Sequence, residues 1–271
     1  MATDTLEIAG TNGRSATTGP APLVFEQVYH RPATMVDVPM HYCPGCAHSL
    51  VHKLIMEVVE ELGIQEQTIG VAPVGCSVFA YEYMDIDMQE AAHGRACAVA
   101  TGIKRLMPEK FVFTYQGDGD LAAIGIAETL HAINRGENIL IVFINNAVYG
   151  MTSGQMAPTT LEGMRTTTSP FGRDPHIHGT PIKVSELMAN LPGAYYVTRQ
   201  VVNNANGVRR TKKALLNAFR YQKQGHGGTC LIEIVGNCPS NWKMTPVEAN
   251  RFIDEVMVKT FPLGDIKVPV D

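Results

Sequence analysis

Two short polar motifs constrain most strongly what this chain can fold into. Gly117-Asp118-Gly119 and Asn145-Asn146 each follow a short apolar segment with strand character, and one helical segment, 121–134, separates them. Asp118 and Asn146 stand 28 positions apart, the length of one complete turn–helix–strand unit. Each residue is therefore expected just past the carboxyl end of a parallel strand, where open α/β sheets bind their ligands.

The rest of the chain continues this alternation of strands and helices. The expected strands are 68–71, 111–115, 138–144, 195–200 and 229–235, and the expected helices are 50–62, 96–106, 121–134 and 208–224. Such alternation predicts an α/β fold with a mostly parallel sheet and helices on both faces. Residues 25–271 are predicted to form a single domain, and residues 1–24, rich in Gly, Ala, Thr and Ser, a mobile N-terminal arm.

Composition excludes several classes of protein. Hydrophobic residues make up 45% of the chain and charged residues 18%, which is typical of a globular protein. A net charge of −4 gives no reason to expect nucleic acid or an anionic membrane as partner. The longest apolar run, 139–144, is too short to span a bilayer, and the polar N-terminus does not resemble a signal peptide. We expect a soluble cytoplasmic protein.

The two polar motifs together favour a metal–diphosphate site. A carboxylate, an amide oxygen and a loop carbonyl, completed by phosphate oxygens, suit a hard cation such as Mg²⁺. The glycines beside Asp118 allow close approach of the backbone, and the amides at the start of the next helix can bind phosphate. A simple turn and a strand-end cap would explain each motif alone. Their spacing favours the metal site.

The cysteines suggest a second site. Cys43 and Cys46 form a Cys-Pro-Gly-Cys pair, which in a chain without a secretory signal indicates metal binding or redox chemistry. Two cysteines in such a loop and two distant ones can build a tetrahedral thiolate site, which by its chemistry accepts either zinc or iron–sulfur. Cys97 and Cys230 stand in apolar segments and are expected to be buried small hydrophobes.

Taken together, residues of about 40–240 resemble the β subunit of the 2-oxoacid:ferredoxin oxidoreductases, which are thiamine-diphosphate enzymes. The matching stretches are His41-Tyr42-Cys43-Pro44-Gly45-Cys46, Val74-Gly75-Cys76-Ser77, His93-Gly94-Arg95, Gly117-Asp118-Gly119-Asp120, Asn146-Ala147-Val148-Tyr149-Gly150-Met151 and Gly236-Asn237-Cys238-Pro239.

The resemblance implies a role for particular residues. It implies Mg²⁺ ligation by Asp118, Asn146 and the Val148 carbonyl. The implied contacts to thiamine diphosphate come from Val74, Gly75, Cys76, Ser77, His93, Gly119, Asp120, Gly150 and Met151. The implied 4Fe–4S ligands are Cys43, Cys46, Cys76 and Cys238, and a cluster held by Cys76 would lie close to the thiazolium.

The implied reaction is the coenzyme A-dependent oxidative decarboxylation of a 2-oxoacid to acyl-CoA and CO₂, with electrons leaving through the cluster to ferredoxin or another acceptor. Thiamine enzymes also need a carboxylate at the pyrimidine N1′, and no glutamate of this chain matches that role. In the resembling family it comes from an α subunit, which we therefore expect as partner. The segment 150–185 and the N-terminal arm are candidate surfaces for it.

The substrate is predicted from the segment after Cys76. Phe79 stands where family members acting on 2-oxoglutarate often place a cation, and Ala80–Met84 contains no basic residue. An apolar wall favours a branched-chain or aromatic 2-oxoacid, such as 2-oxoisovalerate or phenylglyoxylate, with 2-oxoglutarate as the alternative. Two other classes stay open: a non-oxidative thiamine decarboxylase or carboligase, and a non-catalytic subunit that binds zinc.

Overall fold

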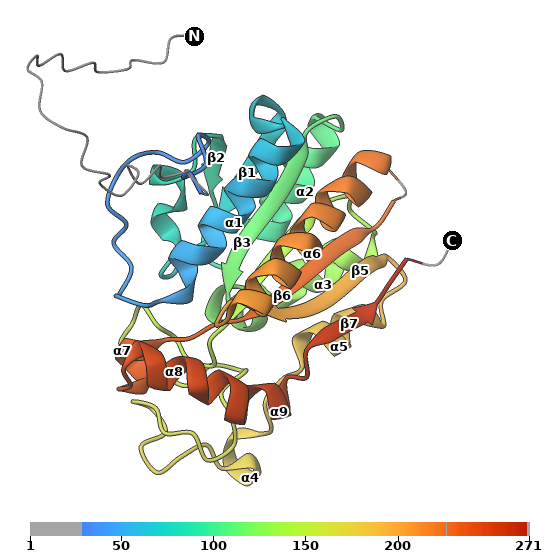
Figure 1. Ribbon diagram of the computed structural model, residues 1–271. Coiled ribbons are helices and arrows are strands. Elements are labelled where there is room, and N and C mark those ends of the chain that lie inside the picture. The colour runs from blue at the N-terminus through green and yellow to red at the C-terminus, as the bar shows by residue number, and fades with distance from the viewer. Residues whose placement is uncertain (1–28, 226, 270–271) are drawn as a thin grey trace, which may run out of the picture. The chain divides into compact units, whose positions relative to one another are not determined.

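The fold is built on one seven-stranded sheet in the order β2-β1-β3-β4-β6-β5-β7 (Figure 1). The computed structural model describes residues 29–225 and 227–269. The strands are β1 Thr68–Ala72, β2 Asp87–Glu90, β3 Phe111–Gly117, β4 Leu140–Asn145, β5 Ala194–Val201, β6 Thr229–Val235 and β7 Gly264–Lys267. All neighbouring pairs are parallel except β5 and β7, which are antiparallel.

Helices cover both faces of the sheet. The α-helices are α1 Ala47–Leu62, α2 Ala96–Leu106, α3 Ile126–Asn134, α4 Pro175–His178, α5 Val184–Ala189, α6 Ala205–Gln224, α7 Pro239–Trp242, α8 Pro246–Phe252 and α9 Val258–Thr260. Short 3₁₀ turns span Gln65–Gln67 and Val78–Glu82, and π-helical segments span Gly119–Ile124 and Ile253–Met257. In Figure 1, α1 and α6 lie in front of the sheet, with α2 and α3 behind it.

The alternation of side chains along β3 shows why both faces need cover. Phe111, Phe113 and Tyr115 pack into one core cluster with α1 and α6, whereas Val112 belongs to a second cluster with α2, α3 and α5. Successive side chains of a strand point to opposite faces, so a strand with apolar side chains at successive positions must be buried on both. The predicted fold class is confirmed.

Sequence periodicity located most of these elements, and the helix 96–106 and the strand 229–235 have the predicted bounds. The predicted helix 121–134 differs: it begins as a π-helical turn, in which Gly125 N donates to Asp120 O at 2.9 Å, before α3. A Cβ on Gly125 would lie 2.4 Å from Asp120 O and 2.6 Å from Gly94 O. The loop that carries Gly94 thus packs directly onto the break in the helix.

A third core cluster lies beyond the carboxyl ends of the strands. It joins Ala147 and Val148, just after β4, to side chains of the C-terminal helices, including Trp242 of α7. Trp242 Nε1 also donates to the Asn146 carbonyl oxygen at 3.1 Å. The C-terminal helices, which periodicity did not predict, therefore fix the loop that follows β4.

Two predictions concern the ends and surface of the chain. The arm predicted over residues 1–24 lies outside the described residues. Within the described part, Arg31 onward forms one compact unit. No described helix is both long and apolar enough to cross a membrane.

Candidate functional site

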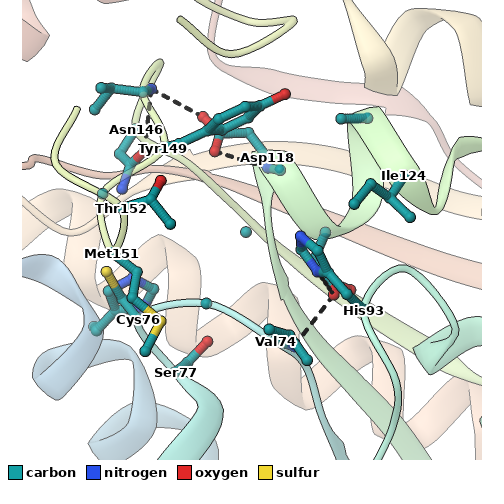
Figure 2. A pocket seen from close by; sticks show the side chains of 18 residues that line it. Val74, Cys76, Ser77, His93, Asp118, Ile124, Asn146, Tyr149, Met151 and Thr152 are labelled. Carbon is teal, nitrogen blue, oxygen red and sulfur yellow. Dashed lines mark hydrogen bonds and ion pairs between the residues drawn. The ribbon is translucent and has the colours of Figure 1, made fainter. Parts of the chain in front are cut away.

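The main cavity, about 370 Å³ in volume, lies at the carboxyl ends of β1, β3 and β4. Its walls are the three loops that follow these strands, together with His48 and His93. Figure 2 shows Asp118, Asn146 and Tyr149 on one side of the cavity and His93 and Val74 on the other. The lining residues are His48, Val74, Gly75, Cys76, Ser77, His93, Gly117, Asp118, Gly119, Asp120, Ala123, Ile124, Asn146, Val148, Tyr149, Gly150, Met151 and Thr152.

This lining contains all nine residues predicted to contact the cofactor and all three predicted Mg²⁺ ligands. The structure therefore brings together residues that the sequence spreads over 78 positions, from Val74 to Met151. Parallel pairing of β1, β3 and β4 is the cause, because it brings their carboxyl ends to the same edge of the sheet.

Asp118 lies at the bottom of this cavity and is 3% exposed. Its Oδ1 accepts a hydrogen bond from Gly119 N at 3.0 Å, and its Oδ2 accepts from Val148 N at 3.1 Å and Thr159 Oγ1 at 3.0 Å. Burial raises the pKa of Asp118 to about 7, although these three hydrogen bonds act to lower it. A carboxylate so desolvated, with no Lys or Arg among the described residues that line the cavity, suits a cation as partner.

Oxygen atoms converge beside Asp118. The side-chain amide of Asn146 ends in one oxygen and one nitrogen, which can exchange places. One of these two positions lies 3.3 Å from Asp118 Oδ2 and 2.7 Å from the Val148 carbonyl oxygen. With nitrogen in that position, the amide donates to both oxygens. With oxygen there, three oxygens share a small volume, which is stable only around a cation. The donor set of carboxylate, amide and carbonyl therefore fits Mg²⁺.

The backbone of this loop is held in an unusual conformation. Ala147 has φ +59°, a left-handed value that L-residues other than Asn or Asp rarely adopt. Thr160 Oγ1 donates to the Ala147 carbonyl at 2.6 Å, and Ala147 N donates to Asn145 Oδ1 at 3.2 Å. Asn145 Nδ2 in turn donates to Glu233 Oε1 at 2.7 Å. The first asparagine of the pair thus shapes the loop, whereas the second faces the cavity.

Glu233 connects this loop to a buried ion pair. Its Oε2 lies 2.8 Å from Arg199 Nε and accepts a hydrogen bond from Ser185 Oγ at 2.5 Å. Glu233 is 1% exposed and Arg199 is fully buried. Breaking such a pair by removing one charge is strongly destabilising, so the network holds Asn145 in place.

Asp120 organises the opposite wall. Its Oδ1 accepts hydrogen bonds from His93 Nδ1 at 2.7 Å, Gly94 N at 2.9 Å and Val74 N at 3.2 Å, and its Oδ2 accepts from Gln116 Nε2 at 2.6 Å. With its carboxylate oxygens taken up by four protein donors, Asp120 positions its neighbours. His93 keeps its second ring nitrogen, Nε2, for the cavity that it lines.

A second, smaller cavity of about 80 Å³ contains all four predicted cluster cysteines in its lining. Cys43 is exposed, Cys46 and Cys76 are half-buried, and Cys238 is buried. Burial raises the pKa of Cys46 to about 11 and that of Cys76 to about 12, so the free thiols stay protonated. Among the described residues, no three Cys, His, Asp or Glu side chains converge closely enough to hold a single metal ion.

The two cavities share part of their walls. Cys76, Asn146, Gly150 and His48 line both. A Cβ on Gly150 would lie 3.0 Å from Cys76 Sγ and 3.6 Å from Cys238 Sγ. The absence of a side chain at Gly150 therefore leaves room for two sulfur atoms beside the cofactor cavity.

The remaining two cysteines are as predicted. Cys97 and Cys230 are 0% and 2% exposed and line neither cavity. Their role in packing is confirmed.

Sequence reasoning assigned no role to several lining residues: His48, Ala123, Ile124, Tyr149 and Thr152. Helical spacing from Asp120 would have indicated Ile124, four positions on. The family resemblance placed Phe79 in the substrate wall, and here the structure differs. Phe79 lines neither cavity and instead packs edge-on against His41, with ring centroids 5.2 Å apart. It stands in the 3₁₀ turn that follows Ser77.

Comparison with known proteins identifies the family. Residues 73–234 match the C-terminal TPP-binding domain of thiamine pyrophosphate enzymes. Ketoisovalerate oxidoreductase subunit VorA of Methanothermobacter thermautotrophicus is 45% identical over 240 residues, which cover 89% of this chain and 50% of that relative. The chain thus spans half the length of this relative.

Other relatives match over most of their length. The 2-oxoglutarate synthase subunit KorB of Archaeoglobus fulgidus is 36% identical, with 80% of this chain and 77% of that protein covered. A solved 2-oxoglutarate:ferredoxin oxidoreductase from Magnetococcus marinus shares the fold, with a TM-score of 0.72, 24% identity and coverage of 88% of this chain and 84% of that chain. The chain therefore belongs to the thiamine-diphosphate-binding β subunits of the 2-oxoacid:ferredoxin oxidoreductases.

Proposed function

We propose that this chain forms the thiamine-diphosphate and iron–sulfur part of a cytoplasmic 2-oxoacid:ferredoxin oxidoreductase. The proposed reaction is coenzyme A-dependent oxidative decarboxylation of a branched-chain or aromatic 2-oxoacid. The observation that carries the proposal is the shared wall: Cys76 lines both the cofactor cavity and the four-cysteine cavity. All six cysteines are free thiols, which suits the reducing cytoplasm.

Different residues of the main cavity would bind different parts of the cofactor. Asp118, Asn146 and the Val148 carbonyl would hold Mg²⁺, whose charge would favour the binding of a diphosphate. His93, fixed by Asp120, would present Nε2 to the opposite side of the bound group. Bound thiamine diphosphate supplies the carbanion chemistry that decarboxylates a 2-oxoacid, and a bound 4Fe–4S cluster carries single electrons away.

The place of the cysteines beside the cofactor cavity favours a cluster over zinc. The four side chains line one cavity, and thiolates alone accept either zinc or iron–sulfur. A 4Fe–4S cluster is larger and is held at its corners by four thiolates. It can also accept electrons, which zinc cannot. Electrons would then pass from the cofactor cavity to the cluster over a short distance, because Cys76 lines both cavities.

The cavity wall implies a second subunit. Among the described residues, no glutamate lines the cavity in a position to be the carboxylate for the pyrimidine N1′. Met151 and Ile124 line the cavity yet are 54% and 51% exposed. Apolar side chains exposed at the edge of an active site are suited to be covered by a partner. We propose that an α subunit covers them and supplies this carboxylate.

An apolar substrate side chain fits this wall better than a second carboxylate. Ala123, Ile124 and Met151 provide its apolar part, in place of Phe79, and no described Lys or Arg lines it. A buried carboxylate would need such a cation. The relative that acts on ketoisovalerate, a branched-chain 2-oxoacid, is also more similar than the 2-oxoglutarate synthases, at 45% against 36% identity.

Anaerobic reconstitution tests the proposed cofactors. The full chain, incubated with ferrous iron, sulfide, Mg²⁺ and thiamine diphosphate, is expected to turn brown and to bind about four irons per chain. Cys43→Ala should lose the colour, whereas Cys97→Ala, which removes a thiol outside the cavity, should keep it. A colourless chain with stoichiometric zinc would support the zinc-binding subunit instead.

Turnover of the complex with its α subunit tests the reaction and the substrate. We expect reduction of a one-electron dye that depends on coenzyme A, with 2-oxoisovalerate or phenylglyoxylate preferred to 2-oxoglutarate and pyruvate. A strong preference for 2-oxoglutarate would overturn the apolar assignment. Decarboxylation without dye reduction would indicate a non-oxidative thiamine enzyme.

A further inference from the structure

His48, in the first turn of α1, lies in the wall between the two cavities and has no part in the mechanism above. It is 3% exposed and lines both the cofactor cavity and the cysteine cavity. The ring of Tyr42 stacks on it, with centroids 5.0 Å apart and an interplanar angle of 19°. A histidine so enclosed presents a fixed ring edge to whatever occupies the cavities.

One nitrogen of this ring is engaged on the protein side. His48 Nδ1 lies 2.8 Å from the hydroxyl of Tyr115 on β3. Tyr115 is fully buried, and burial raises its pKa well above the usual value, so the hydroxyl keeps its proton. Among the described residues, His48 is the only hydrogen-bond partner of that hydroxyl. The hydroxyl therefore donates to Nδ1.

This donation determines the tautomer of the imidazole. When Nδ1 accepts a hydrogen bond, the proton of a neutral ring resides on Nε2. Among the described residues, the one side-chain hydrogen bond of His48 is that of Nδ1. Nε2–H is therefore a donor in the wall that the two cavities share.

We propose that His48 is a positioning residue whose Nε2–H donates a hydrogen bond to a sulfur of the cluster in the cysteine cavity and raises its reduction potential. The inference rests on the proposed function. Reduction adds negative charge to the sulfur atoms, so a hydrogen bond to sulfur is stronger in the reduced state and favours it. Asn241 Nδ2, 3.3 Å from Cys238 Sγ, already provides one donor to a ligand sulfur.

A redox titration followed by electron paramagnetic resonance tests this role on the reconstituted full chain. His48→Leu should shift the cluster to a more negative potential, by about 59 mV for a tenfold loss in the reduced-to-oxidised ratio. His48→Gln, which keeps an N–H donor, should restore much of the shift. The affinity for thiamine diphosphate with Mg²⁺ is measured by calorimetry on the same preparations, because His48 lines the cofactor cavity too.

His52→Leu is the matched control. His52 is also a buried histidine of α1, one turn later, but it contacts the Tyr42 hydroxyl at 3.1 Å and lines neither cavity. It should leave the potential unchanged. An unchanged potential in His48→Leu, or a shift equal to that of His52→Leu, would overturn the inference. A loss of thiamine diphosphate affinity at constant potential would do so too, because Nε2–H would then serve the other cavity.

A second variant covers the case in which His48→Leu does not keep a cluster. Tyr115→Phe removes the hydroxyl that fixes the tautomer and leaves the histidine in place. We expect a smaller negative shift of the potential, and no shift would refute the role of Nε2–H. Failure of the proposed function looks different, because the unsubstituted chain would then take up no cluster at all.

Discussion

The two cavities are neighbours, yet they are assembled in opposite ways. The proposed Mg²⁺ and cofactor site is formed by loops directly after adjacent parallel strands, and its key residues, Asp118 and Asn146, are buried. The cysteine site joins a loop before α1, a loop after β1 and a loop after β6, so that Cys43 and Cys238 stand 195 positions apart. One site depends on the sheet and the other on packing between distant loops.

This difference predicts that the two sites respond differently to substitution. Strand pairing defines the positions of Asp118 and Asn146 before any ligand binds, and the Glu233 network adds support. The cysteine loops have fewer such supports, and Cys43 is exposed. We therefore expect substitutions in the cofactor site to change affinity without loss of the cluster. Substitutions in the loops that carry the cysteines should affect binding of the cluster first.

The largest effect is expected from Asp118→Ala. The substitution removes the one charged residue among the proposed Mg²⁺ ligands and leaves the Thr159 hydroxyl without its acceptor. Affinity for thiamine diphosphate with Mg²⁺ should fall by at least about a thousandfold, roughly 4 kcal/mol. Calorimetric titration measures it. Iron content should stay unchanged, and loss of both together would contradict independent sites.

Asp87→Ala is the control for this charge removal. Asp87 is exposed on the edge strand β2 and lines neither cavity. Its removal should leave cofactor affinity within about twofold of that of the unsubstituted chain, as expected for an isolated surface charge.

The second largest effect is expected from Gly150→Ala, which tests the wall that the two cavities share. Gly150→Ala would place a Cβ 3.0 Å from Cys76 Sγ and 3.8 Å from Asn146 Nδ2. Iron incorporation should fall about tenfold because the sulfur must move, and cofactor affinity should fall less. Iron analysis and calorimetry on one preparation give both values. A larger loss of cofactor affinity than of iron would show that the wall belongs mainly to the cofactor site.

Gly102→Ala is the matched control, since Gly102 lies within α2 and a Cβ there meets no atom within 4 Å. Alanine is a better helix former than glycine, so this variant should gain up to about 1 kcal/mol of stability. Neither iron content nor cofactor affinity should change.

Asp120→Asn tests the support of the cofactor wall. An amide in place of the carboxylate turns an N–H group toward Gln116 Nε2 or toward the three donors at Oδ1. The free energy of unfolding should fall by about 2 kcal/mol, and cofactor affinity should fall about tenfold as His93 and Val74 shift. Thermal unfolding and calorimetry measure these. The same change at Asp265, an exposed residue that accepts one hydrogen bond from Tyr196, should cost much less.

The contrast between the sites also explains what the sequence could predict. Periodicity located β3 and β4, and parallel pairing then placed Asp118 beside Asn146 without further knowledge. No such rule connects Cys238 to Cys43, and only the resemblance to a family joined them. Phe79 shows the limit of short-range inference: it stands in a 3₁₀ turn that periodicity did not predict, and it lines neither cavity.

The sequence also did not reveal the residues that act by positioning other residues. Asn145 resembles Asn146 in a motif, but the structure directs it to Glu233, away from the cavity. His48 follows Cys46 by two positions, yet its place between the cavities depends on the packing of α1 against β3. Such roles depend on which face of an element is buried against which neighbour, and that is a property of the whole fold.

The smallest effect should come from Asn237→Ala, and it bears most directly on the cysteine site. Asn237 Oδ1 accepts a hydrogen bond from Ala47 N at 3.0 Å, and its Nδ2 donates to Asn250 Oδ1 at 2.7 Å. It thus ties the loop that carries Cys238 to the start of α1, directly after Cys46. Loss of both bonds should cost about 1–2 kcal/mol locally, since a buried N–H is left unpaired.

We expect the loss of these two hydrogen bonds to change the rate at which iron is released. With the loops less firmly joined, iron should leave Asn237→Ala several-fold faster than the unsubstituted chain in the presence of a chelator, whereas cofactor affinity should not change. Asn138→Ala removes one comparable bond, to the Gln222 carbonyl at 3.0 Å, before β4 at the other end of the sheet. It should not affect iron release. Equal rates in the two variants would mean that the cysteine site is as firmly supported as the sheet-based one, and the contrast between them would fail.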